Sequence, residues 1–233
     1  EPVGFNPAEI FAALALLEKE RGIPQSFMME KIVQALTTAY KRDHADVENV
    51  IVDVDDARGN TLAQALGVLY VRCDVGDKAQ VDALVAQVLA AYGRIDVLVN
   101  NAGIFRAADF LEVTEEDFDA VLRVNLKGAF LVGQAVARAM AAHNGGRGGG
   151  AIVNMSSVNG VLAIPSISSY NVSKGGVNQL TRVMALALAD KNIRVNAVAP
   201  GTIATELAAK AVLTSDEAKS KIMSRTPMKR LGE

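Results

Sequence analysis

The chain has 233 residues, half of them hydrophobic, and a formal net charge of −2. This length can bury a sizeable core, and the near-neutral charge gives no electrostatic reason to expect nucleic acid or an anionic membrane as a partner. Cys73 is the only cysteine, which excludes an internal disulfide and favours a reducing cytoplasm. We find no apolar run of membrane-spanning length, and both histidines lack ligand-like neighbours, so we expect a cytoplasmic protein without a metal site.

The N-terminal segment predicts two helices joined by a short turn. Asn6-Pro7-Ala8-Glu9 has the residues of a helix start, with an N-cap asparagine, a proline in the first turn and a glutamate three residues after the cap. Gly22 can end this first helix, and a second helix is expected from about Gln25 to about Arg42. We therefore expect residues 1–48 to form a helical hairpin that precedes the rest of the chain.

This hairpin resembles the start of the N-terminal domain of the bacterial transcription elongation factor NusA. The resemblance rests on Leu16-Leu17-Glu18-Lys19-Glu20-Arg21-Gly22-Ile23, on Glu30-Lys31-Ile32-Val33-Gln34-Ala35-Leu36 and on Ala39-Tyr40-Lys41-Arg42. It implies that the segment contacts RNA polymerase, as the NusA domain does. A generic helical hairpin packed on a core would account for the same residues, so both interpretations stay open.

From residue 49 onward, short apolar runs alternate with helical patterns. The expected strands are residues 50–54, 68–72, 95–99, 151–156 and 193–199, and the expected helices include 57–66, 78–92 and a long helix after Thr114. This alternation is typical of an α/β fold with a mostly parallel sheet and helices on both faces. Because residues 95–99 are almost continuously apolar, we expect that strand to be buried on both faces.

A serine, a tyrosine and a lysine form the candidate reactive group. Tyr170 and Lys174 are four residues apart and share one face of a helix. A neighbouring ammonium favours the phenolate, so we expect Lys174 to lower the pKa of Tyr170 towards neutrality. Ser157 follows the strand 151–156, and ligands gather at the carboxyl ends of strands in open α/β sheets. The three residues therefore predict an acid–base site.

Ser157, Tyr170 and Lys174 at this spacing, together with Asn100-Asn101-Ala102-Gly103 after a strand, resemble the motifs of the short-chain dehydrogenase/reductase family. The resemblance implies a Rossmann-like, doubly wound fold and hydride transfer between a nicotinamide cofactor and a small-molecule alcohol or ketone. Tyr170 would exchange the hydroxyl proton, Lys174 would also hold the nicotinamide ribose, and Ser157 would bind the substrate oxygen. Asn125 would distort its helix and hold a water that relays protons to the lysine.

The resemblance also implies a set of cofactor-binding residues. Asp53 best matches the acid that binds the adenosine ribose hydroxyls, and because an acid there repels a 2′-phosphate, NAD is preferred over NADP. An ordinary strand-end aspartate would explain Asp53 equally well, and Asn101 could have the structural role of tying neighbouring strands together. The other implied cofactor contacts are Asp74, Val75, Asn101, Ala102, Gly103, Tyr170, Lys174, Pro200, Gly201, Ile203 and Thr205.

The chain departs from the family pattern at both ends. Members open with a strand, a Thr-Gly-x-x-x-Gly-x-Gly turn and a helix, whereas no such glycine pattern occurs before Gly59. Members also continue past the equivalent of Glu233 with one more helix and a last strand. Since the first strand of a doubly wound sheet lies at its middle, we expect a vacancy there. Residues 49–233 would then form a dehydrogenase-like domain that is incomplete at both ends.

These observations lead to two hypotheses about function. In the first, the chain is a fusion, or chimera, that keeps the catalytic residues but binds dinucleotide poorly. In the second, the dehydrogenase part is inert and the hairpin binds RNA polymerase. An artefact of gene prediction or construction would also explain the N-terminal segment. A segment from Glu206 to about Met228 is expected to form a lid, while a homo-oligomer and the identity of the substrate both stay open.

Overall fold

The structure is a computed structural model that describes residues 50–53, 55–143, 149–205 and 216–232. The chain divides into two units, residues 1–49 and 50–233, and the fold described below is that of the second. The hairpin expected over residues 1–48 lies outside the described residues. Its resemblance to NusA and the domain boundary at residue 48 therefore stay predictions.

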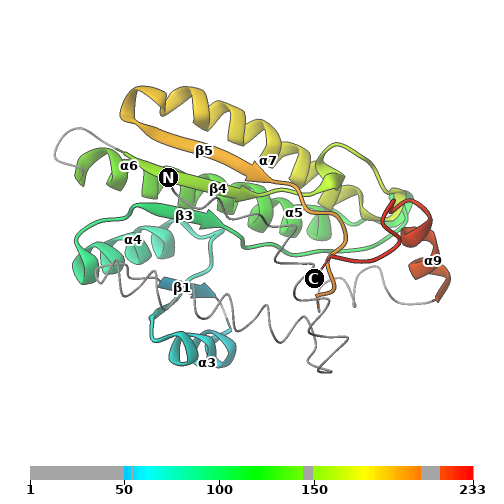
Figure 1. The fold of residues 1–233 in the computed structure, drawn as a ribbon, viewed down its shortest axis with the longest axis horizontal. Helices are drawn as coiled ribbons and strands as arrows, with labels where there is room; N and C mark the ends of the chain where they lie inside the picture. The colour runs from blue at the N-terminus through cyan, green and yellow to red at the C-terminus, as the bar shows by residue number, and fades with distance from the viewer. Residues whose placement is uncertain (1–49, 54, 144–148, 206–215, 233) are drawn as a thin grey trace, which may run out of the picture. The chain divides into compact units, whose positions relative to one another are not determined.

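The strands of this unit form two parallel sheets. In the first, β1 (Val50–Asp53) pairs with β2 (Leu69–Arg72), and in the second, β4 (Gly150–Met155) lies between β3 (Val97–Asn100) and β5 (Ile193–Val198), as Figure 1 shows. All three strand pairings are parallel. The predicted α/β fold with a mostly parallel sheet is therefore confirmed.

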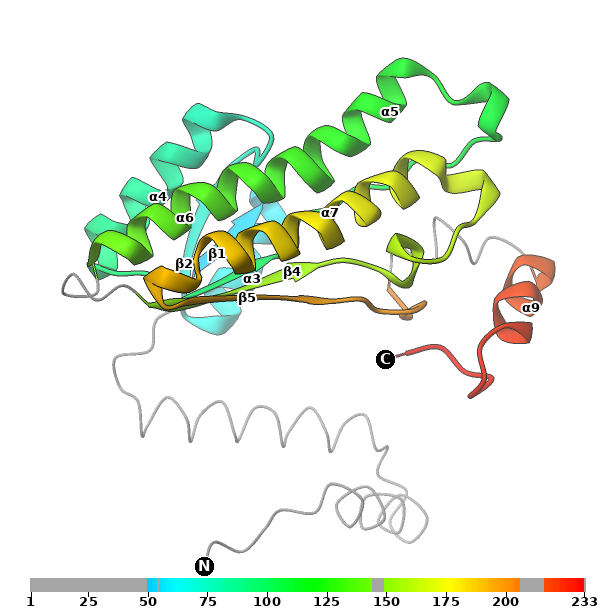
Figure 2. The ribbon, with the colours of Figure 1, turned by 90° about the horizontal axis from the view of Figure 1, so that it is seen from above.

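Helices connect successive strands and cover the larger sheet. They are α3 (Asp56–Leu66), α4 (Lys78–Tyr92), α5 (Glu115–Leu122), α6 (Ala129–His143), α7 (Ser168–Ala187) and α9 (Asp216–Ser224). Figure 2 shows α6 and α7 lying along the larger sheet; α6 contacts β3, β4 and β5, and α7 contacts β4 and β5. A π-helical turn, η2 (Arg123–Gly128), joins α5 to α6. Of the expected lid, 206–228, the described part contains α9 and the turn that follows it.

The bounds of α4 follow from its sequence. Asp77 precedes the helix, and its carboxylate accepts hydrogen bonds from the backbone N–H groups of Ala79 and Gln80, which satisfies two donors of the first turn. Gly93 ends the helix with a φ of 74°, a left-handed conformation that glycine adopts without strain. Its N–H donates to the carbonyl of Leu89 at 2.8 Å. The predicted helix over residues 78–92 is therefore confirmed.

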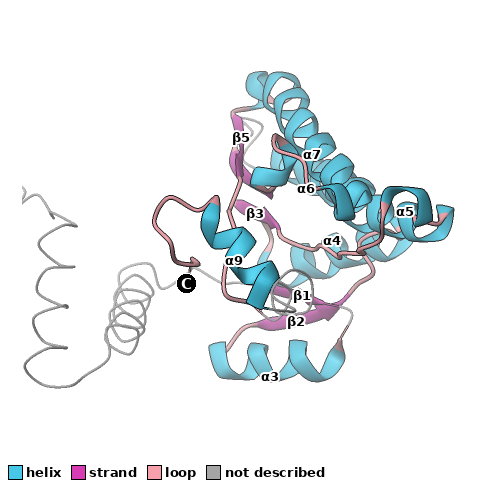
Figure 3. Ribbon diagram, turned by 90° about the vertical axis from the view of Figure 1, so that its right-hand side faces the viewer, coloured by secondary structure: helices cyan, strands magenta, loops and turns pink. Residues whose placement is uncertain are grey.

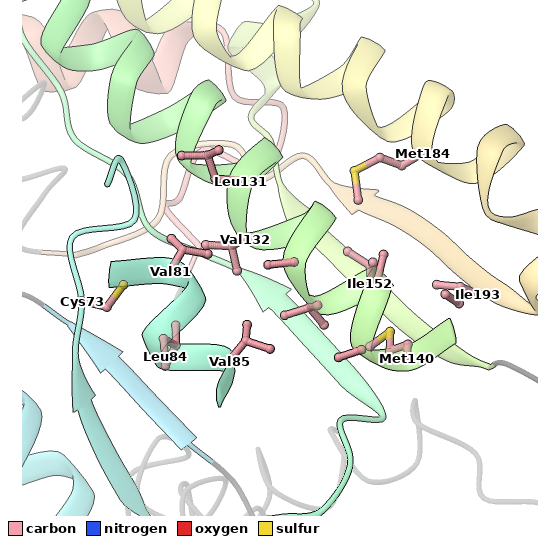
Figure 4. Close-up of a cluster of buried hydrophobic side chains, with 14 of the residues drawn as sticks. Cys73, Val81, Leu84, Val85, Leu131, Val132, Met140, Ile152, Met184 and Ile193 are labelled. Carbon is pink, nitrogen blue, oxygen red and sulfur yellow. The ribbon is translucent and has the colours of Figure 1, made fainter. Parts of the chain in front are cut away.

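The hydrophobic core lies between α4, α6 and the larger sheet (Figure 4). Its buried side chains come from successive elements of the chain: Val81, Leu84 and Val85 on α4, Leu131, Val132 and Met140 on α6, Ile152 on β4 and Ile193 on β5. Val81, Met140 and Ile152 have no exposed surface. This core fixes the position of β4, the strand that leads into the candidate site.

Strand β3 is buried on one face only, so the expectation of burial on both faces was wrong. Val97 is 61 % exposed and Val99 is 55 % exposed, whereas Leu98 between them packs against the core. Successive side chains of a strand point to opposite faces, and the helix that contacts β3, α6, lies on the side of Leu98. The apolar sequence of this strand therefore did not show whether one of its faces is covered or both.

The two sheets are separate in the described part of the chain. No strand among the described residues pairs with both β1 and β3, and Figure 3 places β1 on the β3 side of β2. The expected vacancy at the centre of a doubly wound sheet lies between these two edges. Since residues 1–49 are outside the described part, the vacancy stays a prediction.

The helix formed by α5, η2 and α6 is the one helix of the described part that is long and apolar enough to cross a membrane. It runs from Glu115 to Ala142, and an 18-residue window within its 28 residues has a mean hydropathy of 1.2. The expectation that no apolar run reaches that length was therefore wrong on these two criteria. Half of its apolar window is buried inside the fold, as in the core helix of a globular domain.

Replacing Asn154 with alanine is expected to lower the free energy of unfolding by about 1–3 kcal/mol. Asn154 is completely buried in β4, where Oδ1 accepts from the Asn100 side chain at 2.9 Å and Nδ2 donates to the Thr181 hydroxyl at 3.0 Å. The alanine leaves these partners short of a hydrogen bond in the core. Urea unfolding measures the loss, with the exposed Asn196→Ala on β5 as control. Equal stabilities of the two variants would contradict the prediction.

Candidate active site

Ser157 lies directly after β4, as the sequence predicts. Its backbone is extended, with φ of −164° and ψ of 157°, and its side chain is buried. The hydroxyl accepts a hydrogen bond from the backbone N–H of Asn159 at 3.1 Å. The carboxyl end of a core strand thus holds this hydroxyl at the edge of the sheet where ligands bind in α/β folds.

Tyr170 and Lys174 lie on α7, and the structure brings both to Ser157. The Ser157 hydroxyl lies close enough to the Tyr170 phenol to lower the pKa of that phenol. The ammonium of Lys174 lies 5.5 Å from the centre of the Tyr170 ring and donates to the carbonyl of Met155 at 2.7 Å. The edge of Phe105 packs against the same ring, with 5.9 Å between ring centres. The tyrosine is therefore in contact with a hydroxyl, a cation and an aromatic wall.

Burial dominates the electrostatics of this group. It raises the pKa of Tyr170, and the hydrogen bond from Ser157 offsets part of that rise. Burial also lowers the pKa of Lys174 from 10.5 to about 8. The expectation that the phenol pKa lies below its usual value was wrong for this arrangement, because burial is the largest cause and the net shift of the Tyr170 pKa is upward.

Asn125 lies in the π-helical turn η2, so the predicted distortion of its helix is confirmed. The side chain is 2 % exposed, and its Oδ1 accepts from the N–H of Ile104 at 2.8 Å. Its Nδ2 donates to the carbonyl of Ile104 at 3.0 Å and to the hydroxyl of Ser173 at 3.0 Å. Both amide protons are thus used within the protein, where they hold the segment around Ile104 against α7. The proton relay through a water at Asn125 stays a prediction.

The segment Asn101–Gly103 crosses over this group. A Cβ added to Gly103 would lie 3.5 Å from the Asn125 amide oxygen and 3.8 Å from the Lys174 ammonium. All three residues of the segment are exposed. The side chain that ties β3 to β4 belongs to Asn100, which donates to Asn154, so assigning that tie to Asn101 was wrong by one residue.

Asp74, expected to contact the adenine, is engaged within the protein. Its carboxylate accepts from the Arg123 guanidinium and from the N–H of Gly76, the latter at 2.9 Å. The Arg123 hydrogen bond holds the pKa of Asp74 below its usual value. Val75 packs against Gly128 of η2. These contacts join the carboxyl end of β2 to the helix that carries Asn125.

Asp53, expected to bind the adenosine ribose, closes β1 directly opposite Arg72 in the parallel register. Arg72 forms an ion pair with Asp56 at 3.1 Å, and both side chains are more than half exposed. The backbone register thus pairs the positions of Asp53 and Arg72 at the carboxyl end of the smaller sheet, separate from the Ser157 group on the larger sheet.

The turn Pro200–Thr205, expected to contact the nicotinamide, follows β5. The carbonyl of Pro200 accepts from the N–H of Val158 at 3.0 Å, which ties the turn to the loop after Ser157. Ile203 pairs with Gly232 in a parallel bridge. The sequence analysis did not predict this pairing. It also did not single out Ser173, although its position three residues after Tyr170 indicates a buried contact beneath the tyrosine.

A parallel α/β fold with Ser157, Tyr170 and Lys174 in contact at the carboxyl end of β4 defines an oxidoreductase-type site, and comparison with known proteins agrees. The family model described as enoyl-(acyl carrier protein) reductase matches residues 32–233. The chain belongs to the short-chain dehydrogenase/reductase family. The match begins within the second helix predicted for the N-terminal hairpin.

Several enzymes and one solved structure illustrate the similarity. The 3-oxoacyl-[acyl-carrier-protein] reductase FabG of Thermotoga maritima is 46 % identical over 160 residues, which cover 69 % of this chain but only 62 % of that reductase. The 2-(R)-hydroxypropyl-CoM dehydrogenase of Xanthobacter autotrophicus is 41 % identical over 181 residues, covering 76 % and 70 % of the two chains. A gluconate 5-dehydrogenase structure from Burkholderia cenocepacia aligns with a TM-score of 0.73 at 39 % identity, covering 78 % and 72 %.

Proposed function

We propose that this chain is an oxidoreductase that transfers a hydride between a nicotinamide cofactor and an alcohol or ketone. The observation that carries the proposal is the grouping of three side chains: the Ser157 hydroxyl acts on the Tyr170 phenol, and the Lys174 ammonium lies 5.5 Å from the centre of the same ring. A reactive oxygen placed between the two hydroxyls would receive a hydrogen bond from each. This arrangement supports carbonyl reduction and its reverse.

Each residue of the group has a distinct role in the proposal. In the reductive direction, Tyr170 donates its proton to the oxygen of the substrate as the carbonyl becomes an alkoxide. Ser157 holds that oxygen by a hydrogen bond, and the cationic Lys174 stabilises the phenolate that remains. Asn125 keeps Ile104 and α7 in register beneath the tyrosine through its three hydrogen bonds.

The described residues fit the nicotinamide half of the cofactor. Gly103 passes close to Asn125 and Lys174, where a side chain would narrow the space, and the turn Pro200–Thr205 lies beside the loop after Ser157. We assign Asn101–Gly103, Lys174 and Pro200–Thr205 to this half, and Asp53, Asp74 and Val75 to the adenosine half. The bound nicotinamide would supply or accept the hydride.

The choice between NAD and NADP depends on the carboxyl end of β1. An acid at Asp53 favours the free ribose hydroxyls of NAD, whereas an arginine nearby can accept the 2′-phosphate of NADP. Arg72 lies opposite Asp53 in the register but is engaged by Asp56. We therefore propose NAD as the preferred cofactor. The aligned gluconate 5-dehydrogenase structure is a complex with NADP, so both nucleotides belong in the test.

NADH binding is expected to be measurable but weak, with a Kd on the order of 0.1 mM, an affinity of about 5.5 kcal/mol. The chain has no tryptophan, so the fluorescence of the nucleotide can be followed without protein background from that residue. NADPH should bind more weakly than NADH, and Asp53→Ala should reduce the difference. Absence of binding by both nucleotides at millimolar concentration would overturn the proposed function.

We place the protein in the cytoplasm, in keeping with its single cysteine. A homo-oligomer is compatible with an apolar groove of about 280 Å³ between α6 and α7, lined by residues that include Phe130, Val183 and Met184. Val183 is 53 % exposed there. The substrate is proposed only as a small alcohol or ketone.

A further inference from the structure

One side chain of α7, that of Asn178, contacts the chain on both sides of Ser157. Its Oδ1 accepts from the Ser156 hydroxyl at 2.6 Å, and its Nδ2 donates to the carbonyl of Gly160 at 3.2 Å. Ser156 immediately precedes Ser157, and Gly160 ends the short turn that follows it. A single amide therefore joins the catalytic helix to the segment that carries the serine.

The orientation of this amide is determined by its partners. A carbonyl can only accept, so the NH₂ group of Asn178 must face Gly160 and its oxygen must face Ser156. The Ser156 hydroxyl is buried and also lies 3.3 Å from the carbonyl of Lys174. The Ser156 contact cannot be exchanged for water without opening the turn, because Ser156 is almost completely buried.

Gly160 allows the turn to lie directly on α7. A Cβ at this position would come within 2.6 Å of the Asn178 side-chain nitrogen and 2.8 Å of the Lys174 carbonyl oxygen. The turn therefore contacts the helix backbone at the residue that supplies the ammonium. The distance between the turn and α7 depends on this contact, and so does the position of the Ser157 hydroxyl.

We propose that Asn178 is a positioning residue that sets the Ser157 hydroxyl against the Tyr170 phenol by holding Ser156 and Gly160. The catalytic consequence rests on the proposed function. The geometric effect does not, because the action of the Ser157 hydroxyl on the ionisation of Tyr170 can be measured without cofactor or turnover. The hydroxyl lowers the pKa of Tyr170, so its displacement moves ionisation of the phenol to higher pH.

The experiment is a spectroscopic titration of Tyr170. The chain has four tyrosines and no tryptophan, so tyrosinate absorbance can be followed, and subtracting the titration of a Tyr170→Phe partner in each background isolates Tyr170. Asn178→Leu, which keeps the size but removes both hydrogen bonds, is expected to lower the ionisation constant of Tyr170 about three- to tenfold. Ser157→Ala should produce a shift in the same direction. Gln179→Leu, at the exposed neighbouring position, is the matched control and should leave the titration unchanged.

The double variant separates positioning from a general structural role. In the Ser157→Ala background, Asn178→Leu is expected to add no further shift, because the hydroxyl on which it acts is gone. Ser156→Ala removes one of the two contacts with little change in volume, and it should give a smaller shift in the same direction if Asn178→Leu fails to fold. An unchanged Tyr170 titration in Asn178→Leu, or equal shifts with and without Ser157, would overturn the proposal. Failure of NADH to bind would overturn the proposed function and leave this result standing.

Discussion

The Tyr170→Phe variant is expected to lose about 10²- to 10⁴-fold in kcat while its affinity for the nicotinamide cofactor stays close to that of the wild type. The phenol is the acid of the Ser157, Tyr170 and Lys174 group. Phenylalanine lacks the hydroxyl that carries the proton but keeps the aromatic ring. Its ring still packs against Phe105. The loss should therefore appear in the chemical step.

The measurement is nucleotide-dependent reduction of a panel of ketones, followed on any substrate that the wild-type protein turns over. Cofactor affinity is measured on the same preparations by fluorescence titration. Tyr92→Phe, at the end of α4 and outside the candidate site, is the control for loss of a phenolic hydroxyl. Retention of most of the wild-type kcat in Tyr170→Phe would show that another group supplies the proton.

The second large effect concerns stability and comes from Lys174. Burial lowers its pKa from 10.5 to about 8, so folding disfavours the ammonium form. Between these two values the unfolded chain binds more protons at this residue than the folded chain does, and stability therefore rises with pH across that window. The contribution is present above pH 10.5 and is lost as the pH falls through about 8. The expected gain over the window is about 3 kcal/mol.

This gain should be visible as a difference between the wild type and Lys174→Met. As the pH rises from 8 to 10.5, the wild type should gain stability relative to the variant, which has no group to titrate at this position. Lys174→Met also removes the hydrogen bond to the Met155 carbonyl. This loss changes the size of the stability difference between the two proteins but contributes little to its dependence on pH. Denaturant unfolding at several pH values measures it, with exposed Lys219→Met as the matched control. A difference that does not vary with pH would contradict a lowered Lys174 pKa.

Local patterns in the sequence predicted most of the described fold. Asp77 and Gly93 mark the two ends of α4 by side-chain capping and by a left-handed turn, both of which depend on neighbouring residues alone. Thr114 likewise caps α5 by accepting from the N–H of Asp117 at 3.1 Å. The positions of Ser157, Tyr170 and Lys174 follow from the same kind of information, since a strand end and one helical face bring them together.

What the sequence could not predict depends on residues far apart in the chain. Whether β3 is covered on one face or two is decided by helices elsewhere, and Val97 and Val99 are exposed although their run is apolar. The pKa of Tyr170 is raised because the fold buries the phenol, and that burial depends on elements that are distant in the sequence. The contact between Asn125 and Ser173 joins residues that are 48 positions apart.

The separation of the two sheets divides the site by chemical task. The groups proposed to handle the proton are attached to β4 and α7, whereas Asp53 and Asp74 lie at the carboxyl ends of the β1–β2 pair. The ion pair between Arg123 and Asp74 links the two parts. Substitutions in the β1–β2 pair can therefore alter nucleotide selectivity independently of the acid–base group, so an altered nucleotide preference can evolve while the proton-transfer machinery is retained.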